Sequence, residues 1–158
     1  MKMSVGVEWA LHSCLELSWA APELVPTTRL ASLRELGAPY LNKQLQALAK
    51  AGIITSTSGP RGGFTLARDP AEITVLDIVE AVEGSAGAFR CTEIRQRGPL
   101  AARPEDCTQA CQIASVMYRA ETAWRRELAT TTIADLAGTV LRDIPGVDTS
   151  VQEFLTGA

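Results

Sequence analysis

Three of the four cysteines lie in one stretch of the chain, as Cys91, Cys107 and Cys111, and the fourth, Cys14, lies near its start. Thiolates are soft ligands that favour zinc or iron–sulfur clusters. The sequence lacks the paired knuckles, with two residues between cysteines, that are typical of structural zinc. Spacing alone therefore leaves three possibilities open: an iron–sulfur site, structural zinc, or free or redox-switching thiols.

The only histidine, His12, follows Glu8 by four residues in a segment with helical periodicity. One helical face can therefore present an imidazole and a carboxylate together, although a lone helical histidine more often lies on the surface or in a satisfied core. Cys14 stands among apolar residues, which indicates buried packing. A helix that began at Pro104–Glu105 would place Cys107 and Cys111 on one face.

Length and charge limit what the protein does. The chain has 158 residues and a net charge of −3, but residues 27–68 carry +5 and the remainder −8. A basic lobe on an acidic body is typical of a polyanion site. There is no glycine-rich phosphate loop and no Ser/His/Asp arrangement, so we do not expect an enzyme. No apolar run could cross a bilayer and no signal peptide is apparent, which favours a cytoplasmic protein without a membrane partner.

The first half of the chain reads as helices followed by a hairpin. Apolar periodicity predicts helices over 5–20, over 27–36 with Gly37 as a left-handed stop, and over 38–51 with Pro39 in the first turn. Residues 53–67 read as a β-hairpin with Arg61 at its tip. This is the winged helix-turn-helix arrangement, whose second helix enters the major groove.

The second half contains a long irregular stretch and a long helix. A helix over 73–83 precedes an irregular stretch over 84–106, and such long loops usually have a function. A helix over 108–130 carries an apolar stripe near a 3.5-residue repeat, which fits either core packing or pairing across a dimer: Ile113, Val116, Met117, Ala120, Ala123, Trp124 and Leu128. A short helix over 133–141 and a loosely held tail complete the chain.

The residues predicted to contact DNA come from the helix pair and the hairpin. Asn42 and Gln44 can pair with adenine, Lys43 can reach guanine or phosphate, and Arg61 suits a narrow minor groove or a phosphate. The full set consists of Thr28, Ala38, Pro39, Tyr40, Asn42, Lys43, Gln44, Ser58, Arg61 and Gly62. The alternative is a helical hairpin packed on a ribbon, with solvated basic residues.

Several motifs, taken in order, resemble the Rrf family of bacterial winged-helix regulators, which includes IscR and NsrR. They include Met1–Ser4, Ala38–Leu41, Leu48–Gly52, Gly62–Arg68 and Glu72–Val79, and Ala81–Gly84 leads on to a cysteine. The resemblance covers roughly residues 1–140. It implies a homodimer with a long dimerisation helix, an iron–sulfur cluster in the loop, and regulated binding to a near-palindromic promoter site.

The cysteine spacing departs from the usual family pattern. The stretches Cys91–Leu100, Cys107–Cys111 and Val7–His12 resemble the actinobacterial redox-sensing subgroup typified by RsrR. That likeness implies a [2Fe–2S] cluster held by Cys91 and Cys111 of one subunit and by Glu8 and His12 of the other. Cys107 is then the spare thiol, although spacing alone leaves it open as a ligand.

These observations predict a mainly α fold with a small β-wing, acting as a homodimeric repressor whose cluster senses redox state. Trp9, beside Glu8, is the candidate for coupling the cluster to DNA; a purely packing role is its alternative. The predicted organisation is a DNA-binding domain over 1–84, a cluster-binding loop over 85–111, dimerisation and C-terminal helices over 108–142, and a tail over 143–158. Nitric-oxide sensing, iron–sulfur-status sensing, a cluster-free thiol switch and a zinc winged helix remain as alternative functions.

Overall fold

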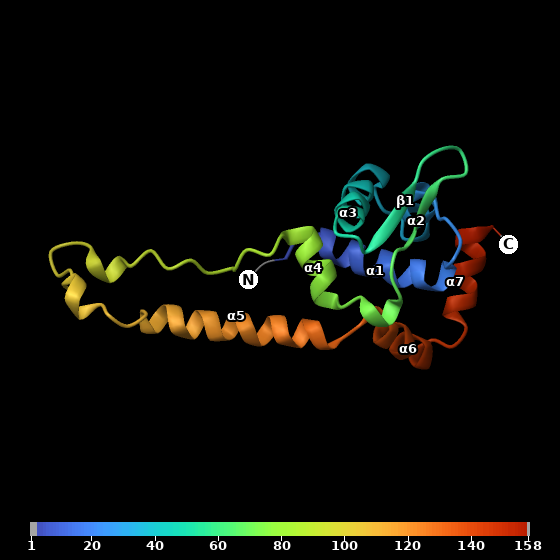
Figure 1. The fold of residues 1–158 in the computed structure, drawn as a ribbon. Helices are drawn as coiled ribbons and strands as arrows, with labels where there is room; N and C mark the ends of the chain where they lie inside the picture. The colour runs from blue at the N-terminus through green and yellow to red at the C-terminus, as the bar shows by residue number, and fades with distance from the viewer. Residues whose placement is uncertain (1–2, 158) are drawn as a thin grey trace. The chain divides into compact units, whose positions relative to one another are not determined.

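A computed structural model describes residues 3–157 as two compact units. The larger unit holds residues 3–85 and 128–157, and the smaller unit holds residues 86–127. None of the helices in the described chain is long and apolar enough to span a bilayer. The fold is mostly helical with a two-stranded antiparallel sheet, as the sequence predicts (Figure 1).

The central helix of the larger unit is α1 (Val5–Ala20). It packs against α3 (Ala38–Lys50), α4 (Val75–Glu83), α6 (Ile133–Asp143) and α7 (Val147–Thr156). Ala10, Cys14 and Leu17 of α1 are fully buried in the same core as Leu41 and Leu45 of α3 (Ala38–Lys50). Pro39 stands in the first turn of α3, where its missing N–H costs no hydrogen bond. The predicted third helix is therefore confirmed.

The turn between the paired helices differs from the prediction. Helix α2 (Thr27–Leu33) ends three residues earlier than expected, and Gly37 has an ordinary φ of −70°. Glu35 instead takes the left-handed conformation, with φ of 53°. The Leu36 N–H donates to the Ala31 carbonyl over 2.8 Å, which closes the helix end as in a Schellman motif.

The wing consists of β1 (Ile54–Thr57) and β2 (Gly63–Leu66), paired from Ile54↔Leu66 to Thr57↔Gly63. This confirms the predicted hairpin. Val25, which precedes α2, extends the pairing: it exchanges two backbone hydrogen bonds of 2.9 Å with Phe64. The helix pair and the wing are thus joined through backbone contacts as well as through side chains.

Gly63 lies where strand β2 passes close to the backbone of Val25, and a residue with a Cβ would clash there. A Cβ at Gly63 would lie 2.6 Å from the carbonyl carbon and oxygen of Val25, so we expect Gly63→Ala to lower the free energy of unfolding by about 1–3 kcal/mol. The matched control is Gly138→Ala inside helix α6, where the nearest atom is 3.8 Å away and alanine should stabilise the helix by roughly 1 kcal/mol. Urea unfolding of both variants tests this expectation, which equal midpoints would contradict.

Helices α4 (Val75–Glu83) and α6 (Ile133–Asp143) each begin with a capping box, formed by Thr74 with Asp77 and by Thr132 with Asp135.

The prediction of a loose C-terminal tail is wrong. Residues Val147–Thr156 form α7, whose Val151 and Leu155 are buried in the core. Arg29 of α2 donates to the Phe154 carbonyl over 2.8 Å and so ties this last helix to the helix pair.

The smaller unit contains most of α5 (Gln112–Thr130), which continues past residue 127 into the larger unit. An extended segment lies beside the helix, with two short 3-10 turns, Ile94–Gln96 and Pro104–Asp106 (Figure 1). The long helix therefore begins four residues later than the predicted Thr108. The condition for Cys107 and Cys111 to share a helical face is not met, because Pro104–Asp106 is only a 3-10 turn. Ile113, Val116 and Met117 of the apolar stripe are 66, 53 and 41% exposed.

Candidate functional site

The exposed face of α3 carries most of the residues expected to contact DNA. Pro39, Tyr40, Asn42 and Lys43 are all exposed. The Thr27 hydroxyl donates to Oδ1 of Asn42 over 3.5 Å. The start of α3 therefore presents amide and ammonium donors to solvent, as base-edge recognition requires.

Gln44 is a correction to the predicted DNA-contact set. Its side chain is only 4% exposed and lies against Gly6 of α1, where a Cβ would come within 2.8 Å of Cδ of Gln44. Gln44 therefore packs the α1–α3 contact and cannot reach a base edge from this position. The sequence pattern misled because Gln44 lies between Leu41 and Leu48 on the inward face of the helix.

The structure adds two polar side chains to the outward face of α3, Gln46 and Lys50, which the sequence analysis did not single out. Helical spacing from Asn42 and Lys43 was the signal that could have found both. The remaining predicted contacts flank this face in sequence: Thr28, Ser58 and Arg61 are exposed, whereas Ala38 and Gly62 are half-buried.

Trp9 of α1 contacts the beginning of α3. Its ring meets that of Tyr40 edge to face, with centroids 5.0 Å apart and planes at 87°. Edge-to-face pairs of this kind add about 0.5–1.5 kcal/mol beyond the area that they bury. The contact connects the residue next to Glu8 directly to a residue at the start of the exposed face of α3.

Glu8 and His12 are both exposed, one turn apart on α1. Two shallow pockets border the pair. One is lined by Met3, Ser4, Val7 and Leu11 besides the pair itself, and the other by Trp9, Arg34 and Leu36. The imidazole and carboxylate therefore stand where an incoming group can reach them, within the larger unit.

One further turn along α1, Glu16 is 1% exposed and its Oε1 accepts a 2.7 Å hydrogen bond from Nε of Arg34. Burial raises the pKa of the Glu16 carboxyl, while the hydrogen bond and charge of Arg34, and the charge of His12, oppose that rise. Because Arg34 follows α2 directly, this pair links α1 to the helix-turn-helix.

The raised pKa of Glu16 predicts a pH dependence of stability. The folded chain holds the Glu16 proton more tightly than the unfolded chain, so ionisation of Glu16 costs stability. Wild-type protein should therefore lose stability relative to Glu16→Gln as pH rises through the raised pKa. Urea unfolding of both proteins from about pH 4 to about pH 8 measures the difference, and a difference that stays constant or changes in the opposite direction contradicts the assignment.

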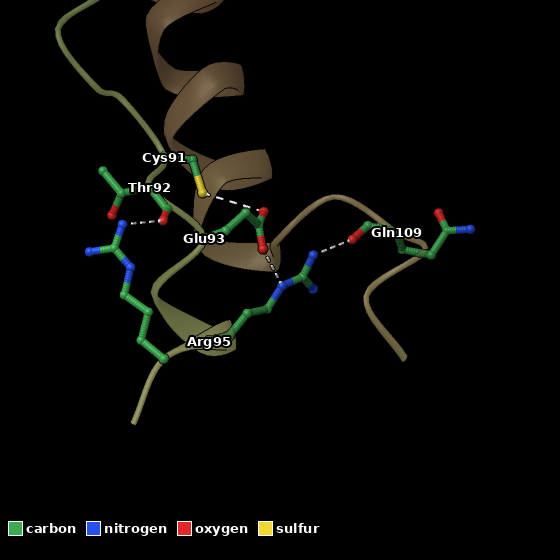
Figure 2. A network of polar contacts seen from close by, with 6 residues as sticks. Cys91, Thr92, Glu93, Arg95 and Gln109 are labelled. Atoms are coloured by element: carbon green, nitrogen blue, oxygen red, sulfur yellow. Dashed lines mark hydrogen bonds and ion pairs between the residues drawn. The ribbon is translucent and has the colours of Figure 1, made fainter. Parts of the chain in front are cut away.

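In the smaller unit, polar contacts connect the cysteine-bearing segments (Figure 2). The Cys91 thiol donates to Oε1 of Glu93 over 3.6 Å, and Oε2 of the same carboxylate accepts a 2.7 Å hydrogen bond from Nε of Arg95. Nη2 of Arg95 donates to the Gln109 carbonyl over 2.6 Å. Gln109 lies midway between Cys107 and Cys111 in the sequence.

Cys111 immediately precedes α5, and its thiol faces the free N–H groups there. Hydrogen bonds from the backbone of Ala114 and Ile113 lower the pKa of Cys111, and the charge of Arg95 lowers it further. Thiolates at helix N-termini are stabilised in this way. Burial has the opposite effect on Cys14, whose pKa it raises to about 12, so the expectation that Cys14 serves packing is confirmed.

A second set of contacts holds the extended segment before Cys91 to α5. Glu121 accepts hydrogen bonds from the Ala88 N–H at 3.4 Å, from Nε1 of Trp124 at 3.1 Å and from Nε of Arg125 at 2.7 Å. The rings of Phe89 and Tyr118 also meet, with centroids 6.0 Å apart. The segment before Cys91 is therefore held to α5 by a backbone hydrogen bond and by a ring contact.

The predicted ligands are divided between the two units: Glu8 and His12 belong to the larger, and Cys91, Cys107 and Cys111 to the smaller. Cys91, Cys107 and Cys111 are half-buried and free of disulfides. Within residues 3–157 of a single chain, no three His, Cys, Asp or Glu side chains form a group that could hold a metal ion.

Comparison with known proteins gives consistent matches. The model of the Rrf2 family, described as an iron-dependent transcriptional regulator, matches residues 3–139. The chain is 31% identical to the protein rrf2 of Nitratidesulfovibrio vulgaris, over 86% of this chain and 87% of that one. It is 30% identical to the IscR regulator of Cereibacter sphaeroides, over 68% of this chain and 72% of the relative.

A solved structure also matches, that of CymR, the global cysteine regulator of Bacillus subtilis. It superimposes with a TM-score of 0.69 at 24% identity, covering 88% of this chain and 98% of CymR, which shows the shared winged-helix fold. Two further curated relatives align over only 56% and 58% of their own lengths.

Proposed function

Because the chain belongs to the Rrf2 family of transcriptional regulators, we propose that it is a homodimeric repressor that binds promoter DNA and responds to redox state through a [2Fe–2S] cluster. DNA binding is the property shared by winged-helix regulators of this family. The dimer, the cluster and the redox response are specific to this proposal. The contact between Trp9 and Tyr40 is the observation that carries it, because it joins the cluster-binding face of α1 to α3.

The DNA-binding surface is α3 with the wing. Pro39, Tyr40, Asn42 and Lys43 lie on its outward face, and Arg61 is exposed at the wing tip. Inserted into the major groove, α3 places these side chains against base edges while Arg61 meets phosphate or the minor groove. The net charge of +5 over residues 27–68 supports this orientation, since the acidic remainder of the chain is repelled by DNA.

The donor set fits a cluster with mixed ligands. We assign Cys91 and Cys111 of one subunit and Glu8 and His12 of its partner as ligands, with Cys107 as the alternative thiolate. The fit rests on the Cys111 thiol, whose lowered pKa favours the thiolate form that a metal requires, and on the exposure of Glu8 and His12. When bound, a [2Fe–2S] cluster with imidazole in place of thiolate supplies a one-electron couple at a raised reduction potential.

The response to redox state requires a path from α1 to DNA. A change at Glu8 or His12 shifts the adjacent Trp9, and the Trp9 ring contacts Tyr40 at the start of α3. The ion pair of buried Glu16 with exposed Arg34 provides a second connection between α1 and the helix pair. Movement of the two reading helices of a dimer would change how well they fit half-sites at a fixed spacing.

Dimerisation through α5 is part of the same proposal. Ile113, Val116 and Met117 expose an apolar stripe on this helix, and a second copy of α5 packed along the stripe would bury it. The shared ligand set requires a dimer, because its members come from two subunits.

The test is a visible absorption spectrum with iron and sulfide analysis on protein purified without air. We expect coloured protein with about two iron and two sulfide per chain, as a [2Fe–2S] cluster requires. Colourless protein with bound zinc would reject the cluster. Iron-free protein that forms a Cys107–Cys111 disulfide on oxidation would support a thiol switch instead, and operator release by nitric oxide but not by a change of oxidation state would identify the alternative signal.

A further inference from the structure

Arg95 connects the two parts of the chain that carry the candidate cysteine ligands. Its Nε donates to Glu93, whose carboxylate also accepts from the Cys91 thiol, and its Nη2 donates to the Gln109 carbonyl. An unbroken series of hydrogen bonds therefore runs from Cys91 to the segment between Cys107 and Cys111 (Figure 2). Residues 97–103 and 107–111 on this path contain neither helix nor strand.

Two backbone features accompany the contacts of the Arg95 side chain: the conformation of Glu93 and a hydrogen bond to the Arg95 carbonyl. Glu93 adopts the left-handed conformation, with φ of 50°, which is uncommon for a residue other than glycine and persists where surrounding contacts hold it. The Ala102 N–H donates to the Arg95 carbonyl over 2.8 Å, so the backbone of Arg95 closes the loop that its side chain spans. The Arg95 side chain is 30% exposed, and its charge also acts on Cys107 and Cys111.

We propose that Arg95 is the positioning residue of the cluster site: it holds the Cys91 and Cys107–Cys111 segments together before the cluster binds, and its charge favours the reduced cluster afterwards. This inference rests on the proposed function. Its physical basis is that a planar guanidinium donates from different nitrogens in fixed directions, so that one side chain can hold two partners in place. In addition, a positive charge near a cluster stabilises the state with one more electron.

The matched control is Arg97, two residues further along. It is a cation of the same loop, but its Nη2 donates to the Thr92 carbonyl over 3.2 Å and does not reach the second cysteine segment. Arg95→Gln and Arg97→Gln therefore remove equal charge, and only the first removes the bridge. Arg95→Lys keeps the charge and loses the two-armed geometry.

Hydrogen–deuterium exchange on the cluster-free full chain tests the bridge. We expect Arg95→Gln to speed exchange about tenfold in peptides covering residues 91–96 and 107–111, with Arg95→Lys intermediate and Arg97→Gln within twofold of wild type. Titration of the loaded protein tests the charge: Arg95→Gln should lower the reduction equilibrium constant about tenfold, a shift of about 59 mV to more negative potential for one electron. Arg95→Lys should stay near the wild-type potential.

The inference is overturned if Arg95→Gln matches Arg97→Gln in either measurement. Its failure is distinguishable from failure of the proposed function. Wild-type protein that binds no cluster rejects the function, whereas the exchange experiment on cluster-free protein still decides whether Arg95 joins the two segments.

Discussion

A His12→Ala variant is expected to lose or change the visible spectrum of the cluster and, with it, the dependence of operator affinity on oxidation state. Loss of the imidazole would remove one of the four protein ligands of the cluster, and with it the ligand that raises the reduction potential. The side chain is exposed on α1, so its removal leaves no cavity and the unfolding midpoint should stay close to that of wild type. Absorption and circular dichroism spectra of protein prepared without air measure both effects.

Cys107→Ser is the control for this experiment. If Cys107 is the spare thiol, the serine variant should retain the wild-type spectrum, whereas Cys111→Ser should not. An unchanged spectrum in His12→Ala removes His12 from the ligand set. A lost spectrum in Cys107→Ser would assign Cys107 as a ligand in place of another thiolate.

Lys43→Ala is expected to weaken promoter binding about tenfold to a hundredfold, since one base-edge contact contributes about 1–3 kcal/mol. Lys43 is exposed on the outward face of α3 and belongs to the basic part of the chain. Fluorescence anisotropy with a labelled promoter fragment at fixed salt measures the change. Arg142→Ala, an exposed arginine of α6 outside residues 27–68, is the control for a simple loss of charge.

Arg61→Ala should act differently, through the salt dependence of binding. If Arg61 at the wing tip meets phosphate, its removal lowers the slope of log affinity against log salt by roughly 0.9. Lys43→Ala should then relax sequence preference, while Arg61→Ala weakens all sequences alike. Wild-type affinity and salt slope in both variants would show that α3 and the wing do not form the DNA-binding surface.

Much of the fold follows from local signals that the sequence carries by itself. Apolar residues at helical spacing predicted α1 and α3, Pro39 marked the start of α3, and the β-branched run before Gly62–Gly63 predicted the wing. These signals are reliable because each reflects the conformational preference of a few neighbouring residues. The basic character of residues 27–68 and the grouping of three cysteines likewise needed no structure.

Tertiary packing decided what local signals left open. Gln44 turned out to be buried because Gly6 of α1 lies against it, and Val151 is buried because the last helix packs on the core. The contact of Trp9 with Tyr40 and the bridge from Arg95 to Gln109 join residues 31 and 14 positions apart. Spacing along a chain states which residues share a helix face or a strand; which element that face meets depends on long-range contacts, and only the folded chain specifies them.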